Sequence, residues 1–314
     1  MNKEIRMLRK TTLSVFALVL GALAVFVPAR AGNLPENLIP EGTRWVAHLD
    51  MEKFVSTQLF KLLDMENGLQ INNRDITRML KIDFFKDITG LTVFGFGPEG
   101  KRGVFLAAGR FDKKRLLTLA ELSDNLKEIA YGGNIIYTTD HNEYGAFVND
   151  GLIAFGERRE DIERVLDAAS GKARNFAGSA LNASLKAASS GSFLSGVFED
   201  LSGLDADFRE SKFMGKAKGL TFLAQEKQDT LQIHLQVTAD SPESAKDMAE
   251  IAQGLLAMAR LSRNEGEGRG WANLAKDARF EASGNVVRLD LSLPSSEAAR
   301  MMSHGRMSLA GIFD

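Results

Sequence analysis

Apolar and polar residues alternate along much of this chain with the period of two that is typical of antiparallel strands. The clearest case is residues 231–237, where four aliphatic residues alternate with Gln232, His234 and Gln236. We expect strands at 45–49, 91–96, 104–108, 135–139, 144–148, 152–155, 193–198, 219–224, 231–237, 279–282 and 286–291. Most neighbouring ranges are joined by short polar or glycine-containing segments, which predicts hairpins.

A longer period predicts helices between these strands. Residues 159–169 place Ile162, Val165 and Leu166 on one stripe, and Gly171 is the expected left-handed stop. Ser241 and Pro242 are suited to the cap and first position of another helix. Further helices are expected around 54–63, from residue 113 behind the cap Asp112, and at the end of the chain behind the cap Ser295.

The order of elements is similar in the two halves of the chain. A Gly-Leu-Thr triplet opens one hairpin at residue 90 and its counterpart at residue 219, an offset of 129 residues. We therefore predict an α+β fold of two similar halves, with mostly antiparallel sheets, helices packed on one face and split βαβ-like units. The predicted repeats are residues 32–172 and 173–314.

Residues 1–31 have the features of a secretory signal peptide. Basic residues precede an apolar run from Thr11 to Val27, and residues 29–31 supply a small-x-small cleavage pattern. We expect cleavage after Ala31 and a periplasmic or extracellular location. An uncleaved anchor is the alternative, because a run of this length is at the short end of what spans a bilayer. No membrane span is expected after cleavage.

The composition excludes several kinds of chemistry. The 314 residues include no cysteine, so disulfides, thiolate metal sites and cysteine nucleophiles are excluded. The net charge of −2 becomes −6 once the leader, with five basic residues and one acidic residue, is removed. A mildly acidic exported chain has no basic field for nucleic acid, so we expect no nucleic-acid partner.

The sequence indicates no cofactor, metal or catalytic set. Residues 95–100 match the G-x-G-x-x-G dinucleotide pattern, but a strand follows where that pattern needs a helix, so a hairpin is predicted. Met301, Met302 and His304 include soft donors that suit copper(I), whereas core methionines of an amphipathic helix are the favoured interpretation.

Two groups of residues remain as candidate sites. Asp140, His141 and Glu143 place carboxylates beside an imidazole, as general acid–base chemistry requires, although a hairpin turn needs polar residues in any case. Arg269 and Trp271 end a run rich in glycine and charge, which is either a binding loop with an aromatic anchor or a mobile surface loop.

The segments 45–50, 109–112, 153–157 and 165–167 resemble uncharacterised secreted bacterial proteins built from duplicated α+β halves. The resemblance covers most of the mature chain, implies fold and location, and transfers no site residue. We predict a non-enzymatic exported interaction or binding module whose partner is a protein or a small ligand. A carrier of a small apolar ligand, suggested by 20 phenylalanines and 11 methionines, and a hydrolase with dispersed carboxylates are the alternatives.

Overall fold

The computed structural model describes most of the chain after the predicted leader. The described residues are 33–65, 77, 82–97, 103–123, 126–140, 143–188, 191–199, 214–261 and 278–303. The predicted leader, His141, Arg269 and Trp271 lie outside them. The chain forms two compact units, the first from Met1–Glu52, Asn72–Gly97 and Lys101–Asn182, and the second from Lys53–Ile71, Pro98–Gly100 and Ala183–Asp314.

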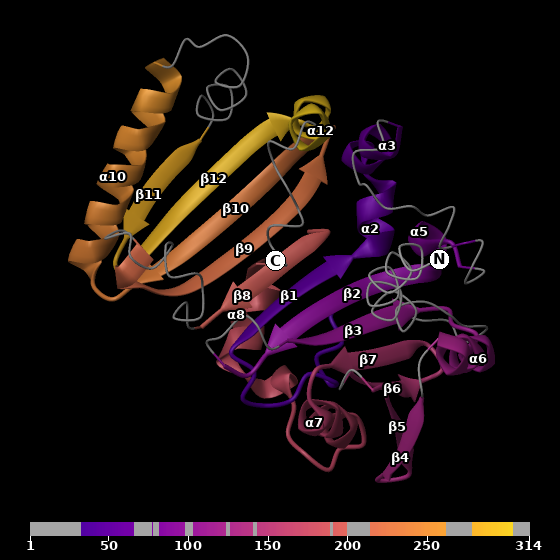
Figure 1. Cartoon of the computed structure of the whole chain (residues 1–314). Helices are drawn as coiled ribbons and strands as arrows, with labels where there is room; N and C mark the ends of the chain where they lie inside the picture. The colour runs from indigo at the N-terminus through magenta and orange to yellow at the C-terminus, as the bar shows by residue number, and fades with distance from the viewer. Residues whose placement is uncertain are drawn as a thin grey trace, which may run out of the picture. The chain divides into compact units, whose positions relative to one another are not determined.

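The first unit is built on antiparallel strands in the order β1-β2-β3-β7-β6-β5-β4 (Figure 1). They are β1 (Trp45–Asp50), β2 (Ile88–Gly95), β3 (Val104–Gly109), β4 (Lys127–Tyr131), β5 (Asn134–Thr138), β6 (Tyr144–Asn149) and β7 (Leu152–Gly156). The antiparallel pairing of β2 with β3 confirms the predicted hairpin in place of a dinucleotide-binding loop.

Helices pack on both faces of this sheet. The helical elements of the first unit are α5 (Phe84–Asp87), α6 (Lys113–Ser123), α7 (Arg159–Ala169) and η1 (Phe176–Gly178). Helix α7 buries Ile162 against one face, where a Cβ added to Gly156 would lie 3.7 Å from Ile162 Cδ1. Ala120 of α6 packs against Phe155 on the other face. This differs from the predicted placement of helices on one face, because both faces of the strands carry apolar residues.

The second unit is built on antiparallel strands in the order β11-β12-β10-β9-β8. They are β8 (Leu194–Phe198), β9 (Ala217–Lys227), β10 (Thr230–Ala239), β11 (Arg279–Ser283) and β12 (Val286–Pro294). Its helical elements are α3 (Gln58–Met65), η2 (Met214–Lys216), α10 (Pro242–Leu261) and α12 (Ser295–Ser303). Two helices, α2 (Met51–Ser56) and α8 (Ala180–Ala188), cross the boundaries between the units along the chain.

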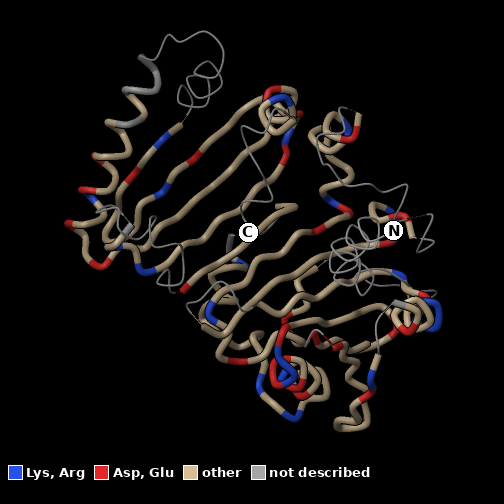
Figure 2. Tube along the Cα trace, viewed as in Figure 1, with Lys and Arg blue, Asp and Glu red and all other residues tan. Residues whose placement is uncertain are grey.

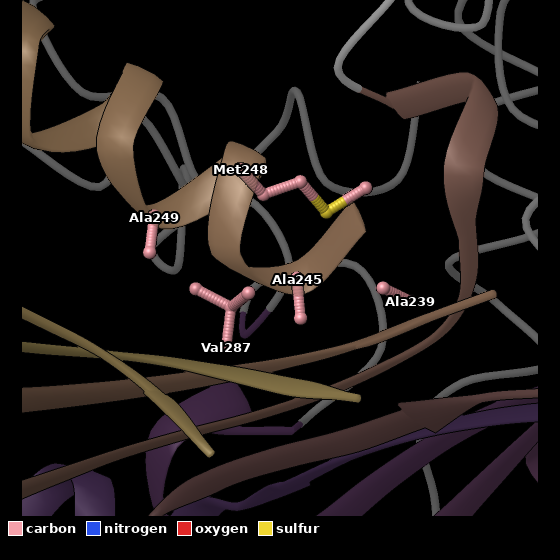
Figure 3. Packing of buried hydrophobic residues seen from close by; sticks show 5 residues of the cluster. All are labelled: Ala239, Ala245, Met248, Ala249 and Val287. Atoms are coloured by element: carbon pink, nitrogen blue, oxygen red, sulfur yellow. The ribbon is translucent and has the colours of Figure 1, made fainter. Parts of the chain in front are cut away.

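Helix α10 begins where the sequence predicts. Ser241 Oγ accepts a hydrogen bond from the Ser244 backbone N–H at 3.1 Å, which confirms the predicted cap. Hydrogen bonds from Ser244 and Ser241, together with nearby lysines, hold the pKa of Asp240 below its ordinary value. Figure 3 shows the next two turns of α10 facing the sheet. The cluster there consists of Ala239, Ala245, Met248, Ala249 and Val287.

The α+β class and its antiparallel pairing are therefore as predicted. The left-handed glycine after α7 is also confirmed, since Gly171 has a φ of +73°. The last helix differs in detail: Ser295 is its first residue rather than a cap before it, and its hydroxyl donates to Glu226. The predicted similarity of the two halves and the predicted repeat boundary are not tested by these elements, and both remain predictions.

Candidate functional site

The apolar face of the second unit carries large side chains that are only half-buried. Phe222 on β9, Leu235 on β10 and Leu289 on β12 lie in one row across the three strands, and Ile233 lies opposite Leu291 in the next row. All five are intermediate in exposure. We call these five residues the apolar strip. Apolar side chains of this size are usually fully buried in a sheet that packs against a core.

Helices pack at both ends of the strip. At one end Val287 and Ala239 are buried beneath α10, with exposed fractions of 4% and 2%. At the other end Leu231 and Leu293 are buried, and the chain leaves β12 directly into α12. The strip is thus the part of the face that lies between the two helices, and its floor is supplied by β9, β10 and β12.

Charged residues are sparse along the strip. Strand β10 contains no lysine, arginine, aspartate or glutamate, and Figure 2 shows it in tan along its length. Alternation along β9 places the Glu226 carboxylate on the same face as Phe222, but beyond the strip. This carboxylate accepts hydrogen bonds from the backbone N–H groups of Gln58 and Leu59, at 2.6 and 2.8 Å. The Ser295 hydroxyl donates to it at 2.6 Å.

The opposite face of the same strands is polar. His234 on β10 lies directly across from Asp290 on β12, and its Nδ1 is hydrogen-bonded to that carboxylate. Gln225 Nε2 donates to Gln232 Oε1 at 3.1 Å and lies 3.5 Å from His234 Nε2. If His234 carries its proton on Nδ1, it donates to Asp290 and its Nε2 can accept from Gln225. Both imidazole nitrogens then have partners within the sheet, so we assign this group of hydrogen-bonded side chains a structural role.

The predicted polar turn is present between β5 and β6. Asp140 forms an ion pair with Lys127, at 2.6 Å, and the Thr139 N–H donates to the Glu143 carbonyl at 3.3 Å. These contacts suit a turn that joins two strands. His141 lies outside the described residues, so the acid–base pairing remains a prediction. Arg269 and Trp271 also lie outside, and the binding loop likewise remains a prediction.

Met301, which the sequence singled out, has an interior position, and so does His48. Met301 is 2% exposed, as a core methionine would be, while His304 falls outside the described residues. His48 is buried in β1, where its Nδ1 lies 2.9 Å from Thr92 Oγ1. In the described ranges no three histidine, aspartate or glutamate side chains converge as metal ligands would.

Comparisons with known proteins show only distant likeness in structure. No family model and no curated protein matches this chain. Crystal form III of TP0453 has a TM-score of 0.48 at 9% identity, covering 87% of this chain and 99% of that one. Crystal form I of the same protein gives 0.47 at 9% identity, covering 88% of this chain and 98% of that one.

In the described part of the chain, no helix is both long enough and apolar enough to cross a bilayer.

The alternation in 231–237 was visible in the sequence and predicted which residues share the apolar face. The strip itself was missed, because the sequence does not show how much of that face the helices cover. The one indirect signal was that the helix after β10 begins behind its cap Ser241 and the last helix begins at Ser295, so both helices start at the ends of strands.

Proposed function

We propose that this protein is a non-enzymatic binding module that holds a small apolar ligand on the apolar strip of the second unit. The observation that carries the proposal is the half-burial of Phe222, Ile233, Leu235, Leu289 and Leu291 between two helix-covered ends. Covering these side chains would remove apolar surface from water, which is favourable by about 25 cal/mol per Å². The predicted export remains part of this proposal on the strength of the leader alone.

The size of the strip favours a small ligand over a protein partner. Three residues along each strand and three strands across give an area of about 10 Å by 14 Å, at about 3.4 Å per residue and 4.8 Å per strand. A stable protein–protein interface buries about 800 Å² on each partner. The strip offers on the order of a fifth of that area, which is enough for one compact apolar molecule.

The test uses the neutral fluorophore N-phenyl-1-naphthylamine, which emits strongly in apolar surroundings. We expect saturable binding to the full mature chain. Leu235→Gln removes one apolar side chain from the middle of the strip, and we expect it to weaken binding about tenfold, since burying a leucine contributes about 1.5–3 kcal/mol. Gln236→Asn is the matched control, because Gln236 is the next residue of β10 and faces the other side.

Circular dichroism establishes that both variants are folded before binding is compared. Equal loss of binding in the two variants, or no loss in Leu235→Gln, would contradict a site on the strip. Native mass spectrometry of freshly purified protein gives a second readout: a mass above that of the bare chain, lost in Leu235→Gln, would reveal a ligand carried from the cell.

A further inference from the structure

The sheet of the first unit has two apolar faces, although only one of them is fully covered. On the face that α7 covers, Phe94, Leu106 and Ala154 are at most 1% exposed. An antiparallel sheet with one such face normally presents polar residues on the other. Here the other face carries Leu91 and Val93 from β2, Phe105 from β3 and Phe155 from β7. We call these four residues the aromatic face.

The four side chains of the aromatic face are contiguous and half-buried. Val93, Phe105 and Phe155 lie in one row across three neighbouring strands. The rings of Phe105 and Phe155 are stacked, with centroids 5.6 Å apart and planes 19° apart. The row is bordered on one side by α6, whose Ala120 packs against Phe155.

The other border is formed by a tryptophan. A Cβ placed on Gly103 would lie 3.2 Å from the Trp45 ring and 3.3 Å from Val93 Cγ1. The indole therefore lies close to Gly103, the residue before β3, and the absence of a side chain there leaves room for it. Phe105 and Phe155 give this surface an aromatic lining, in contrast to the mostly aliphatic apolar strip, and the buried Trp45, 8% exposed, closes its edge.

We propose that the aromatic face is a second ligand site, which takes an apolar compound containing a planar ring, so that one chain binds two ligands. Aromatic side chains interact with ring compounds by offset stacking and edge-to-face contacts, which adds about 0.5–1.5 kcal/mol beyond the burial of area. The surface spans roughly three strands and three residues, about 14 Å by 10 Å, again far below the area of a stable protein interface. This second site shares the ligand class of the proposed function but is formed by separate residues in the other unit.

Native mass spectrometry with N-phenyl-1-naphthylamine tests the number of sites. We expect two bound molecules per wild-type chain and one in Leu235→Gln, where the aromatic face remains. Phe105→Leu keeps the site apolar but removes a ring. We expect it to weaken the binding of the molecule that Leu235→Gln retains by about three- to tenfold. Val93→Thr is nearly isosteric and should weaken binding in the same way. It replaces Phe105→Leu in the experiment if Phe105→Leu does not fold.

The matched control is Ile135→Thr, because Ile135 lies on the same face at β5, outside the aromatic face, and is already 39% exposed. The wild-type chain could instead bind only one molecule. If Leu235→Gln abolished its binding and neither Phe105→Leu nor Val93→Thr changed it, the second site would be overturned and the proposed function would stand. Binding that only Phe105→Leu and Val93→Thr weaken would instead overturn the proposed function and support the second site.

Discussion

At the scale of single residues, Glu226 joins three segments that are distant in the sequence. Its carboxylate accepts two backbone N–H groups at the start of α3 and the hydroxyl at the start of α12. The first N–H groups of a helix have no partner inside the helix, and the positive end of the helix dipole favours an anion there. One side chain on β9 therefore satisfies groups that water or a local cap would otherwise satisfy.

We expect Glu226→Gln to lower the free energy of unfolding by about 1–3 kcal/mol, because the amide removes the charge and turns one acceptor atom into a donor that faces other donors. Equilibrium denaturation in urea measures the change. Glu281→Gln on exposed β11 is the control in the same unit and should change stability by less than about 0.5 kcal/mol. An equal effect of the two substitutions would show that the network around Glu226 does not matter for stability.

The role of Glu226 was not predictable from the sequence, since its partners lie 168 and 69 residues away. The same holds for the pairing of His234 with Asp290. Alternation placed His234 on the polar face of its strand correctly, but the register that brings Asp290 opposite depends on how β10 and β12 align. Local sequence patterns predict which face of a strand a side chain lies on, but they do not predict which residue it contacts on the neighbouring strand.

At the scale of elements, helix ends follow from local chemistry. Gly171 lies just after α7 with a φ of +73°, and the Gly171 N–H donates to the Ala168 carbonyl at 3.1 Å. A left-handed residue after a helix is usually glycine, because any Cβ raises the energy of that conformation. A Cβ at Gly171 would meet no atom within 4 Å, so the backbone conformation alone accounts for any effect of substitution.

Gly171→Ala is expected to lower the free energy of unfolding by about 1 kcal/mol, through conformational strain alone. Gly178→Ala provides the comparison, because a Cβ there also meets nothing within 4 Å while the φ of Gly178 is not positive. Thermal unfolding followed by circular dichroism should show a lower midpoint for the first variant and an unchanged or slightly higher midpoint for the second. If both variants had a lower midpoint, the loss of stability in Gly171→Ala would have a cause other than the positive φ of Gly171.

The sequence predicted most strands within a few residues and missed elements for identifiable reasons. Strand β4 was missed because Lys127 and Glu128 give it a polar, exposed surface at the edge of the sheet. The expected helix around 54–63 is two helices. Thr57 separates them, since its hydroxyl donates to the Phe54 carbonyl and accepts from the Phe60 N–H. The sequence pattern shows the apolar face that both helices share but does not show this cap.

At the scale of the whole molecule, the two units are interleaved along the chain. Residues 53–71 belong to the second unit although they come between segments of the first. Phe54 illustrates this, because its ring lies 5.3 Å from that of Phe193 and 5.4 Å from that of Phe60. Element order in the sequence therefore predicted the type of fold, but it could not predict which segments each unit recruits.

The predicted leader allows a test on the whole chain. Expressed with its own first 31 residues in a bacterial host, the protein is expected in the periplasmic or secreted fraction, beginning at Gly32, with 283 of its 314 residues. Intact-mass measurement and amino-terminal sequencing check both points. Full-length protein recovered from the membrane fraction would instead support the uncleaved anchor, and full-length protein in the cytosol would contradict export.

The three-way connection at Glu226 also constrains the order in which the second unit acquires its structure. The backbone N–H groups of residues 58 and 59 gain their acceptor only when residue 226 is in place, and the hydroxyl that completes the group belongs to residue 295. Contacts that close such long loops form slowly, because the chain loses entropy before it gains any bond. The start of α3 is therefore expected to gain protection from hydrogen exchange late in refolding, together with α12 and well after the β9–β10 hairpin.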